Sequence, residues 1–84
     1  MILTGEVGNR LKPLLRAALP DADIEAIGAD TVADDVFGWD SMAHVSIIVS
    51  IEEEFGIVFE PAEVTGFDNV GQLIALIEKK MAIA

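Results

Sequence analysis

The 84-residue sequence contains no cysteine and only five lysines and arginines. Without cysteine the chain can form no disulfide, and it offers no thiol nucleophile or cysteine ligand for a metal ion. No apolar run approaches the roughly 20 residues that a membrane span needs, so we expect none. The first residues, MILTGEVGNR, lack a basic region followed by an apolar stretch. We therefore expect no signal peptide and a cytoplasmic location.

The scarce basic residues lie near the two ends of the chain. Between Ala17 and Glu78 there is no lysine or arginine, whereas 14 of the 15 acids lie there, and the formal net charge is -10. Nucleic acids and anionic membranes require basic patches, so neither is an expected partner. A basic protein surface would be attracted. Solubility alone is the competing explanation for this charge.

Length and hydrophobic pattern predict one small all-α domain over residues 1–84. A hydrophobic fraction of 52% supplies enough apolar side chains for one core. Apolar residues recur at helical spacing, with plausible caps, in four stretches. These stretches cover residues 4–19, 41–55, 61–64 and 69–81. The prediction is a four-helix bundle with a long first loop and a short third helix.

Several residues define the expected boundaries of these helices. Thr4, Asp40 and Asp68 are the expected N-caps, Gly56 is the expected C-cap of the second helix, and Pro61 is the expected first residue of the third. Two further features concern the first helix and the loop after it. Pro13 should kink the first helix or move its start to a later residue. Residues 21–40 should form an ordered loop with a helical turn at 24–27, pinned by Ile24, Ile27, Val32, Val36, Phe37 and Trp39.

The second helix has an unusually wide apolar arc. Residues Val45, Ile47, Ile48, Val49, Ile51 and Phe55 cover about 200° of its circumference. Such an arc predicts a central helix that packs against more than one neighbour.

The stretch GWDSMAHV at 38–45 contains the candidate functional serine, Ser41. A serine hydrolase needs a histidine at the hydroxyl and a carboxylate that orients the histidine. His44 is three residues away, but Asp40 is expected to cap the helix, and the sequence has no G-x-S-x-G turn. The sequence therefore argues against hydrolysis, and His44 is expected to be a half-exposed helix residue.

The acidic segments do not predict a metal site. Residues 21–25 (DADIE) begin like a calcium-binding loop, but Ala26 and Val32 stand where that loop needs glycine and glutamate. Glu52, Glu53 and Glu54 are expected to form a solvated helix face.

Ser41 is well placed to carry a phosphate. It would be exposed at a helix N-terminus, where the helix dipole and free backbone N–H groups favour an anion. An Asp-Ser pair before an apolar helix is also a common helix cap without further function.

The order of motifs resembles the acyl carrier protein family. The first motif is Phe37-Gly38-Trp39-Asp40-Ser41-Met42, followed by a helix that ends in Glu-Glu-Glu-Phe-Gly-Ile. A short helix after Pro61 and a last helix that begins at 68–70 complete the order. The resemblance covers nearly the whole chain. It implies that Ser41 carries 4'-phosphopantetheine, whose thiol holds an acyl group as a thioester.

The resemblance also implies roles for other residues. Asp40 would cap the helix and help to position the phosphopantetheinyl transferase and its magnesium. Met42, Glu53 and Glu54 would dock partner enzymes, and Ile47, Ile51, Val64 and Phe67 are candidates for lining an acyl-chain space, with core packing as the alternative. Such a chain would be no enzyme, and its partners would be the transferase and acyl-loading and acyl-accepting enzymes. We expect a monomer.

One departure from the family pattern concerns the pathway. Carriers of fatty acid synthesis have acids two and five residues after the serine, where this chain has Ala43 and Ser46. The chain therefore looks more like a discrete carrier of a specialised polyketide, nonribosomal peptide or surface saccharide pathway. A carrier of general fatty acid synthesis and a noncovalent acidic interaction module remain the alternatives.

Overall fold

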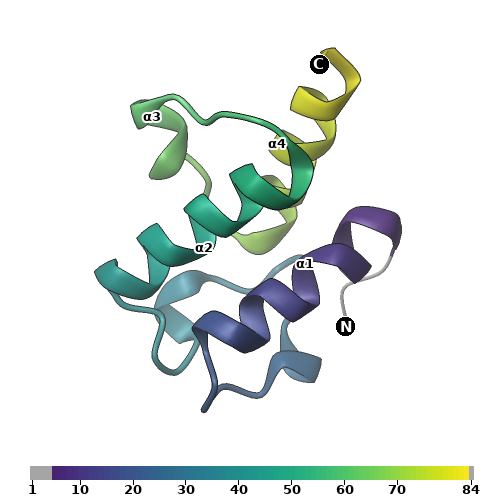
Figure 1. Cartoon of the computed structure of the whole chain (residues 1–84). Coiled ribbons are helices and arrows are strands. Elements are labelled where there is room, and N and C mark those ends of the chain that lie inside the picture. Colours follow the sequence, from purple (N-terminus) through teal and green to yellow (C-terminus); the bar gives the residue numbers. More distant parts are fainter. Residues whose placement is uncertain (1–4, 84) are drawn as a thin grey trace.

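The computed structural model describes residues 5–83, and this part of the chain is helical without a strand. Its elements are α1 (Gly5–Ala18), η1 (Ile24–Ala26), η2 (Ala33–Asp35), α2 (Ser41–Phe55), α3 (Pro61–Val64) and α4 (Val70–Ile83). Helix α2 crosses the middle of the molecule, with α1 on one side and α3 and α4 on the other (Figure 1). The predicted four-helix bundle with a long first connection and a short third helix is confirmed.

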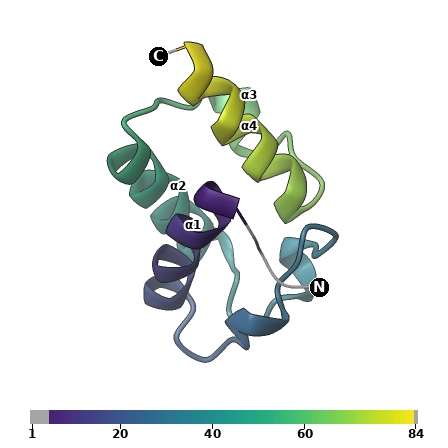
Figure 2. The ribbon, with the colours of Figure 1, turned by 90° about the vertical axis from the view of Figure 1, so that its right-hand side faces the viewer.

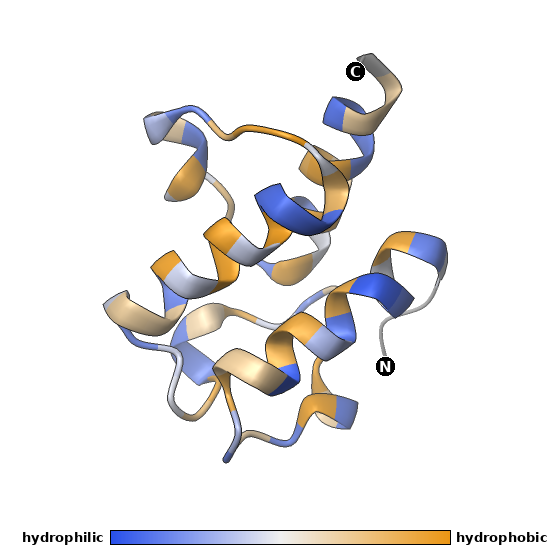
Figure 3. Ribbon diagram, viewed as in Figure 1, coloured by the Kyte–Doolittle hydropathy of each residue, from blue (hydrophilic) through white to orange (hydrophobic). Residues whose placement is uncertain are grey.

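A single apolar core joins α1, α2 and α4. Helix α1 contributes Val7, Leu11 and Leu15 at a spacing of four residues, which places them on one face. Each of these residues is at most 5% exposed. They meet Ile47 and Ile51 of α2 and Leu73 and Ile77 of α4 in the same cluster. The ribbon coloured by hydropathy shows apolar and polar positions alternating around these helices (Figure 3).

Pro13 does not delay the start of α1, contrary to one of the two expected effects. The helix already begins at Gly5 and continues through Pro13 to Ala18. Pro13 is exposed, while Leu11 and Leu15 on either side are fully buried. Burial of the apolar face thus compensates for the backbone hydrogen bond that proline cannot donate. The expected cap Thr4 lies outside the described residues.

The long connection between α1 and α2 is ordered, as predicted, but fewer side chains hold it than expected. Ile24, Ile27 and Trp39 are buried, whereas Val32 and Phe37 are 40% and 72% exposed. The predicted helical turn is present as η1, whereas η2 was not predicted. The connection returns to the N-terminal end of α2, as both ribbon views show (Figures 1 and 2).

The boundaries of α2 and α3 are those that the sequence predicts. Asp40 is the N-cap of α2, and Gly56 ends the helix with a left-handed φ of 66°. Glycine reaches this conformation without steric cost. Pro61 occupies the first turn of α3, where its missing N–H has no helical partner in any case.

Two predictions at the later elements are corrected. Helix α4 runs to Ile83, beyond the expected end at Met81. Its N-cap is Asn69 and not the expected Asp68, because Asn69 Oδ1 accepts the N–H of Gln72 at 2.9 Å. The backbone N–H of Asp68 is donated to the Gln72 side chain. The amide side chain of Asn69 is one residue closer to the helix, so it reaches the N–H group that a cap satisfies.

The width of the buried face of α2 is also corrected. Ile47, Ile48 and Ile51 are buried, but Val45 and Val49 are 58% and 46% exposed. The apolar arc is as wide as the sequence indicates, yet its neighbours cover only part of it.

Candidate functional site

Ser41 is the first residue of α2 and is exposed to solvent. Asp40 precedes it in extended conformation, and its Oδ1 accepts the N–H of Ala43 at 2.8 Å. Within residues 5–83, the N–H groups of Ser41 and Met42 have no hydrogen-bond acceptor. A phosphate on the Ser41 hydroxyl would therefore find two free donors and the positive end of the helix dipole beside it.

His44 lies one turn after Ser41 and uses both of its ring nitrogens. The Trp39 indole Nε1–H donates to His44 Nδ1 at 3.0 Å, and His44 Nε2 lies 2.6 Å from the carbonyl oxygen of Val64. Because Nδ1 accepts, the ring proton sits on Nε2 and is donated to Val64. The imidazole thus has no free nitrogen to act as a base for Ser41, which agrees with the expectation that the chain is not a hydrolase.

His44 also stacks on Phe67. Their ring centroids are 5.6 Å apart with an interplanar angle of 28°. The ring of Trp39 lies on another side of the imidazole, at 6.2 Å. The side chain is only partly exposed, as expected, but its contacts with the first connection and the end of α3 were not predicted from the sequence.

A cavity of about 530 Å³ opens beside Ser41. Its walls include Asp34 and Trp39 of the first connection, Ser41 and His44 of α2, and Val64 and Thr65 at the end of α3. This volume lies within the range of about 300–1,000 Å³ that is typical of sites for small organic ligands. The candidate serine therefore stands at the edge of a space that could hold a group attached to it.

The expected docking residues differ in their surroundings. Met42 is 81% exposed and shares one face of α2 with Val45 and Val49. Glu53 is exposed further along the helix. Glu54 instead accepts a hydrogen bond from Arg10 Nε at 3.0 Å, and the same guanidinium lies over the Phe55 ring. Of the two acids, Glu53 has the freer carboxylate.

The four candidates for an acyl-chain space all belong to the core, where Val64 and Phe67 pack against the cluster that contains Ile47 and Ile51. Ile47 and Ile51 are fully buried in the core. Val64 lines the cavity beside Ser41, whereas Phe67 lines a separate cavity of about 420 Å³ between α3 and α4.

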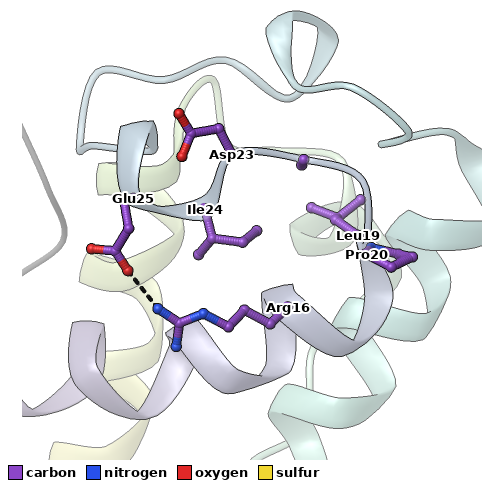
Figure 4. A pocket seen from close by; sticks show the side chains of 7 residues that line it. Arg16, Leu19, Pro20, Asp23, Ile24 and Glu25 are labelled. Atoms are coloured by element: carbon purple, nitrogen blue, oxygen red, sulfur yellow. Dashed lines mark hydrogen bonds and ion pairs between the residues drawn. The ribbon is translucent and has the colours of Figure 1, made fainter.

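Another cavity, of about 300 Å³, lies where α1 meets η1 (Figure 4). Leu19 and Ile24 line it beside an ion pair between Arg16 and Glu25. None of the residues around it belongs to the wall of the cavity at Ser41.

Among residues 5–83, no three acidic or histidine side chains are grouped so that they could hold a metal ion. Over the same residues, no helix has the length and apolar character to cross a membrane.

Comparisons with known proteins agree with this geometry. The family model for a phosphopantetheine attachment site matches residues 9–77. The acyl carrier protein of Streptomyces coelicolor is 28% identical over 74 residues, which cover 88% of this chain and 80% of that protein. The acyl carrier protein of Thermotoga maritima is 26% identical over 76 residues, or 90% of this chain and 93% of that one.

A solved structure is similar over most of its length. The holo acyl carrier protein from Geobacter metallireducens, determined by solution NMR, has a TM-score of 0.79 and 36% sequence identity. The similarity covers 89% of this chain and 85% of that one.

Proposed function

Because the chain belongs to the acyl carrier protein family, we propose that Ser41 is the residue that carries its prosthetic group. The group of this family is 4'-phosphopantetheine, bound covalently. When bound, it supplies a terminal thiol that holds an acyl group as a thioester. In this proposal the chain catalyses no reaction but presents the acyl group to enzymes. We also propose that residues 1–84 form one carrier domain, which the single core of the described residues supports.

The observation that carries the proposal is the exposed hydroxyl at the start of a 15-residue helix. Among the described residues nothing accepts the N–H groups of Ser41 and Met42, which could therefore bind a phosphate oxygen, and the adjoining cavity has room for an organic arm. Asp40 keeps the third amide of the turn occupied and so holds Ser41 at the first position of the helix. We propose that Asp40 also faces the transferase and its magnesium.

The first prediction concerns attachment. Incubation with coenzyme A, magnesium and a broad-specificity phosphopantetheinyl transferase should add one phosphopantetheine to the wild type and none to Ser41→Ala. Ser46→Ala is the matched control, because Ser46 is exposed on the same helix. Intact mass measures the gain. An unmodified wild type with several transferases would instead favour a noncovalent interaction module in which Asp40 and Ser41 only begin a helix.

We further propose that partner enzymes dock on the exposed face of α2. Met42, Val45 and Val49 form an apolar stripe there, and Glu53 supplies a charge near its end. We keep Glu54 as a docking residue at the edge of this surface, because it follows Glu53 around the helix and pairs with Arg10 of α1. A fitting partner has an apolar contact surface with basic residues at its rim.

The second prediction tests this docking surface. Glu53→Lys and Met42→Ala should each lower the kcat/KM of Ser41 modification about tenfold, which corresponds to roughly 1.4 kcal/mol. Added salt should reduce the effect of Glu53→Lys only, because screening acts on charge. The control Glu78→Lys makes the same charge change on α4 and should leave the rate unchanged. Equal losses of kcat/KM in Glu53→Lys and Glu78→Lys would show that the net charge of the chain, and not a docking surface on α2, controls modification of Ser41.

The last part of the proposal concerns the biosynthetic pathway that this carrier serves. Ala43 and Ser46 leave the first half of α2 without the acids of fatty acid synthesis carriers, and Val45 between them is exposed. We propose a dedicated carrier of a specialised pathway. A malonyltransferase of general fatty acid synthesis should load the holo protein poorly, and Ala43→Asp with Ser46→Glu should improve loading. Efficient loading of the wild type would favour general fatty acid synthesis.

A further inference from the structure

Two cavities border α3 and the segment that follows it. The cavity beside Ser41 includes Val64 and Thr65 in its wall, whereas the cavity between α3 and α4 includes Glu63, Gly66 and Phe67. Their linings share no residue, although both contain neighbours from this short segment. What separates them is therefore the segment itself and the side chains that hold it against α2.

His44 is the side chain of α2 that stands between the two cavities. It lines the cavity at Ser41, and its ring stacks on Phe67, which lines the other cavity. Its Nε2 is bonded to the Val64 carbonyl at the end of α3, and its Nδ1 accepts from the Trp39 indole. The imidazole is thus held on three sides, by residues from α3, from the segment after it and from the first connection.

A chain attached at Ser41 would have to displace this ring to pass between α2 and α3. Displacement would break both hydrogen bonds and leave the indole N–H of Trp39, a residue only 8% exposed, without its acceptor. Unpaired polar groups in such surroundings are costly. Deeper on α2, Ile47 and Ile51 are fully buried in the core, so the space beyond the ring is the second cavity, which Phe67 lines.

We propose that His44 is a specificity-determining residue that keeps the cargo of this carrier outside the helical bundle. The cargo is a short acyl group, held in the cavity beside Ser41. Asp34, Asp40 and Thr65 lie at this cavity, but most of its lining surface is apolar and includes Trp39 and Val64. The arm itself takes up much of the space, because a site of this volume suits one drug-sized group. The inference rests on the proposed attachment at Ser41.

The test compares a short and a long acyl group on the same serine. Acetyl-phosphopantetheine and octanoyl-phosphopantetheine are transferred from the two acyl-coenzyme A thioesters, and intact mass confirms loading. Cleavage of each thioester by hydroxylamine is then followed by mass. In the wild type both should react at the same rate, because neither is enclosed. The backbone amide signals of Ile51 and Phe67 should be the same in both loaded forms.

Variants at His44 complete the test. In His44→Ala the octanoyl thioester should react about tenfold more slowly, since loss of ordinary hydrogen bonds shifts an opening equilibrium by about this factor. The acetyl thioester should be unaffected. His44→Gln can still donate to Val64 and accept from Trp39, so it should behave like the wild type, as should the control Ser46→Ala. Circular dichroism verifies that each variant is folded.

The outcomes separate this inference from the proposed function. Slow cleavage of the octanoyl thioester in the wild type would overturn the inference while confirming attachment at Ser41. Equal rates in the wild type and no protection in a folded His44→Ala would show that His44 does not control access. Failure of both groups to load on Ser41 would overturn the proposed function and the inference together.

Discussion

At the scale of single residues, Asp40 combines two roles that can be separated. Its carboxylate accepts the N–H of Ala43 and so caps α2. It also adds a negative charge next to the proposed attachment serine. A capping oxygen does not need to be charged, since asparagine caps helices about as well as aspartate. Substitutions at Asp40 can therefore distinguish support of the helix from a role towards partner enzymes.

The third prediction follows from this distinction. Asp40→Ala should cost about 1 kcal/mol, and the melting temperature should fall by roughly 4–8 °C. Asp40→Asn keeps the acceptor for Ala43 and should melt close to the wild type. If Asp40→Asn is nevertheless modified slowly at Ser41, the charge serves the transferase. A large loss of stability in Asp40→Asn would mean that charge, rather than capping geometry, stabilises the start of α2.

At the scale of elements, α3 is held by polar contacts as well as by Val64, which packs against the core. None of its four residues is buried. Val64 accepts a hydrogen bond from His44 of α2, and Glu63 forms an ion pair with Lys80 of α4 at 2.7 Å. The hydrogen bond from Lys80, together with the backbone N–H of Glu60, lowers the pKa of Glu63 below its ordinary value. Helix α3 is thus tied to a helix on either side of it.

The fourth prediction is that the stability contributed by the Glu63–Lys80 ion pair depends on pH. Because the pKa of Glu63 is lower in the folded chain, the unfolded chain binds the proton more readily. The stabilisation by Glu63 is then complete above its ordinary, unfolded pKa and is lost as pH falls through the folded pKa. Glu63→Gln should lower the melting temperature at neutral pH, and its difference from the wild type should vanish in acid.

A glutamate outside this ion pair provides the control. Glu78→Gln removes an exposed carboxylate from α4 and should not reproduce this pH dependence. A constant difference between Glu63→Gln and the wild type across the acid range would show that shape or packing, rather than charge, explains the loss.

At the scale of the whole molecule, charge opposes the compact state. The formal net charge is -10, and three of the five basic side chains form ion pairs within residues 5–83. Most acids therefore have no cation beside them in the described chain. Like charges on a small domain repel each other, and the repulsion is relieved by unfolding.

The fifth prediction is that salt stabilises the protein. Raising sodium chloride from about 0.02 M to about 0.5 M shortens the screening length and should weaken repulsion more than the few ion pairs. We expect the melting temperature to rise by roughly 5 °C, equivalent to about 1 kcal/mol. Thermal denaturation followed by circular dichroism measures the rise. A fall would mean that the ion pairs stabilise the fold more than the excess charge destabilises it.

Much of this protein can be predicted from its sequence because the decisive interactions are local. Asp40 caps a turn that begins at the next residue, Gly56 supplies the left-handed conformation that ends the same helix, and Pro61 starts α3. Each feature depends on a few adjacent residues, so the sequence identifies the position of Ser41 at a helix start. The order of these motifs along the chain also indicates the family.

The tertiary structure decided what lies around that serine. Periodicity predicts the apolar face of α2, but only the packed neighbours determine that Val45 and Val49 stay exposed. Arg10 reaches Glu54 across 44 residues of sequence, and His44 meets Val64 across 20. Such contacts depend on how the helices pack, which no local pattern encodes. The helix that presents Ser41 was thus determined by neighbouring residues, and the cavity beside it by residues that only folding brings together.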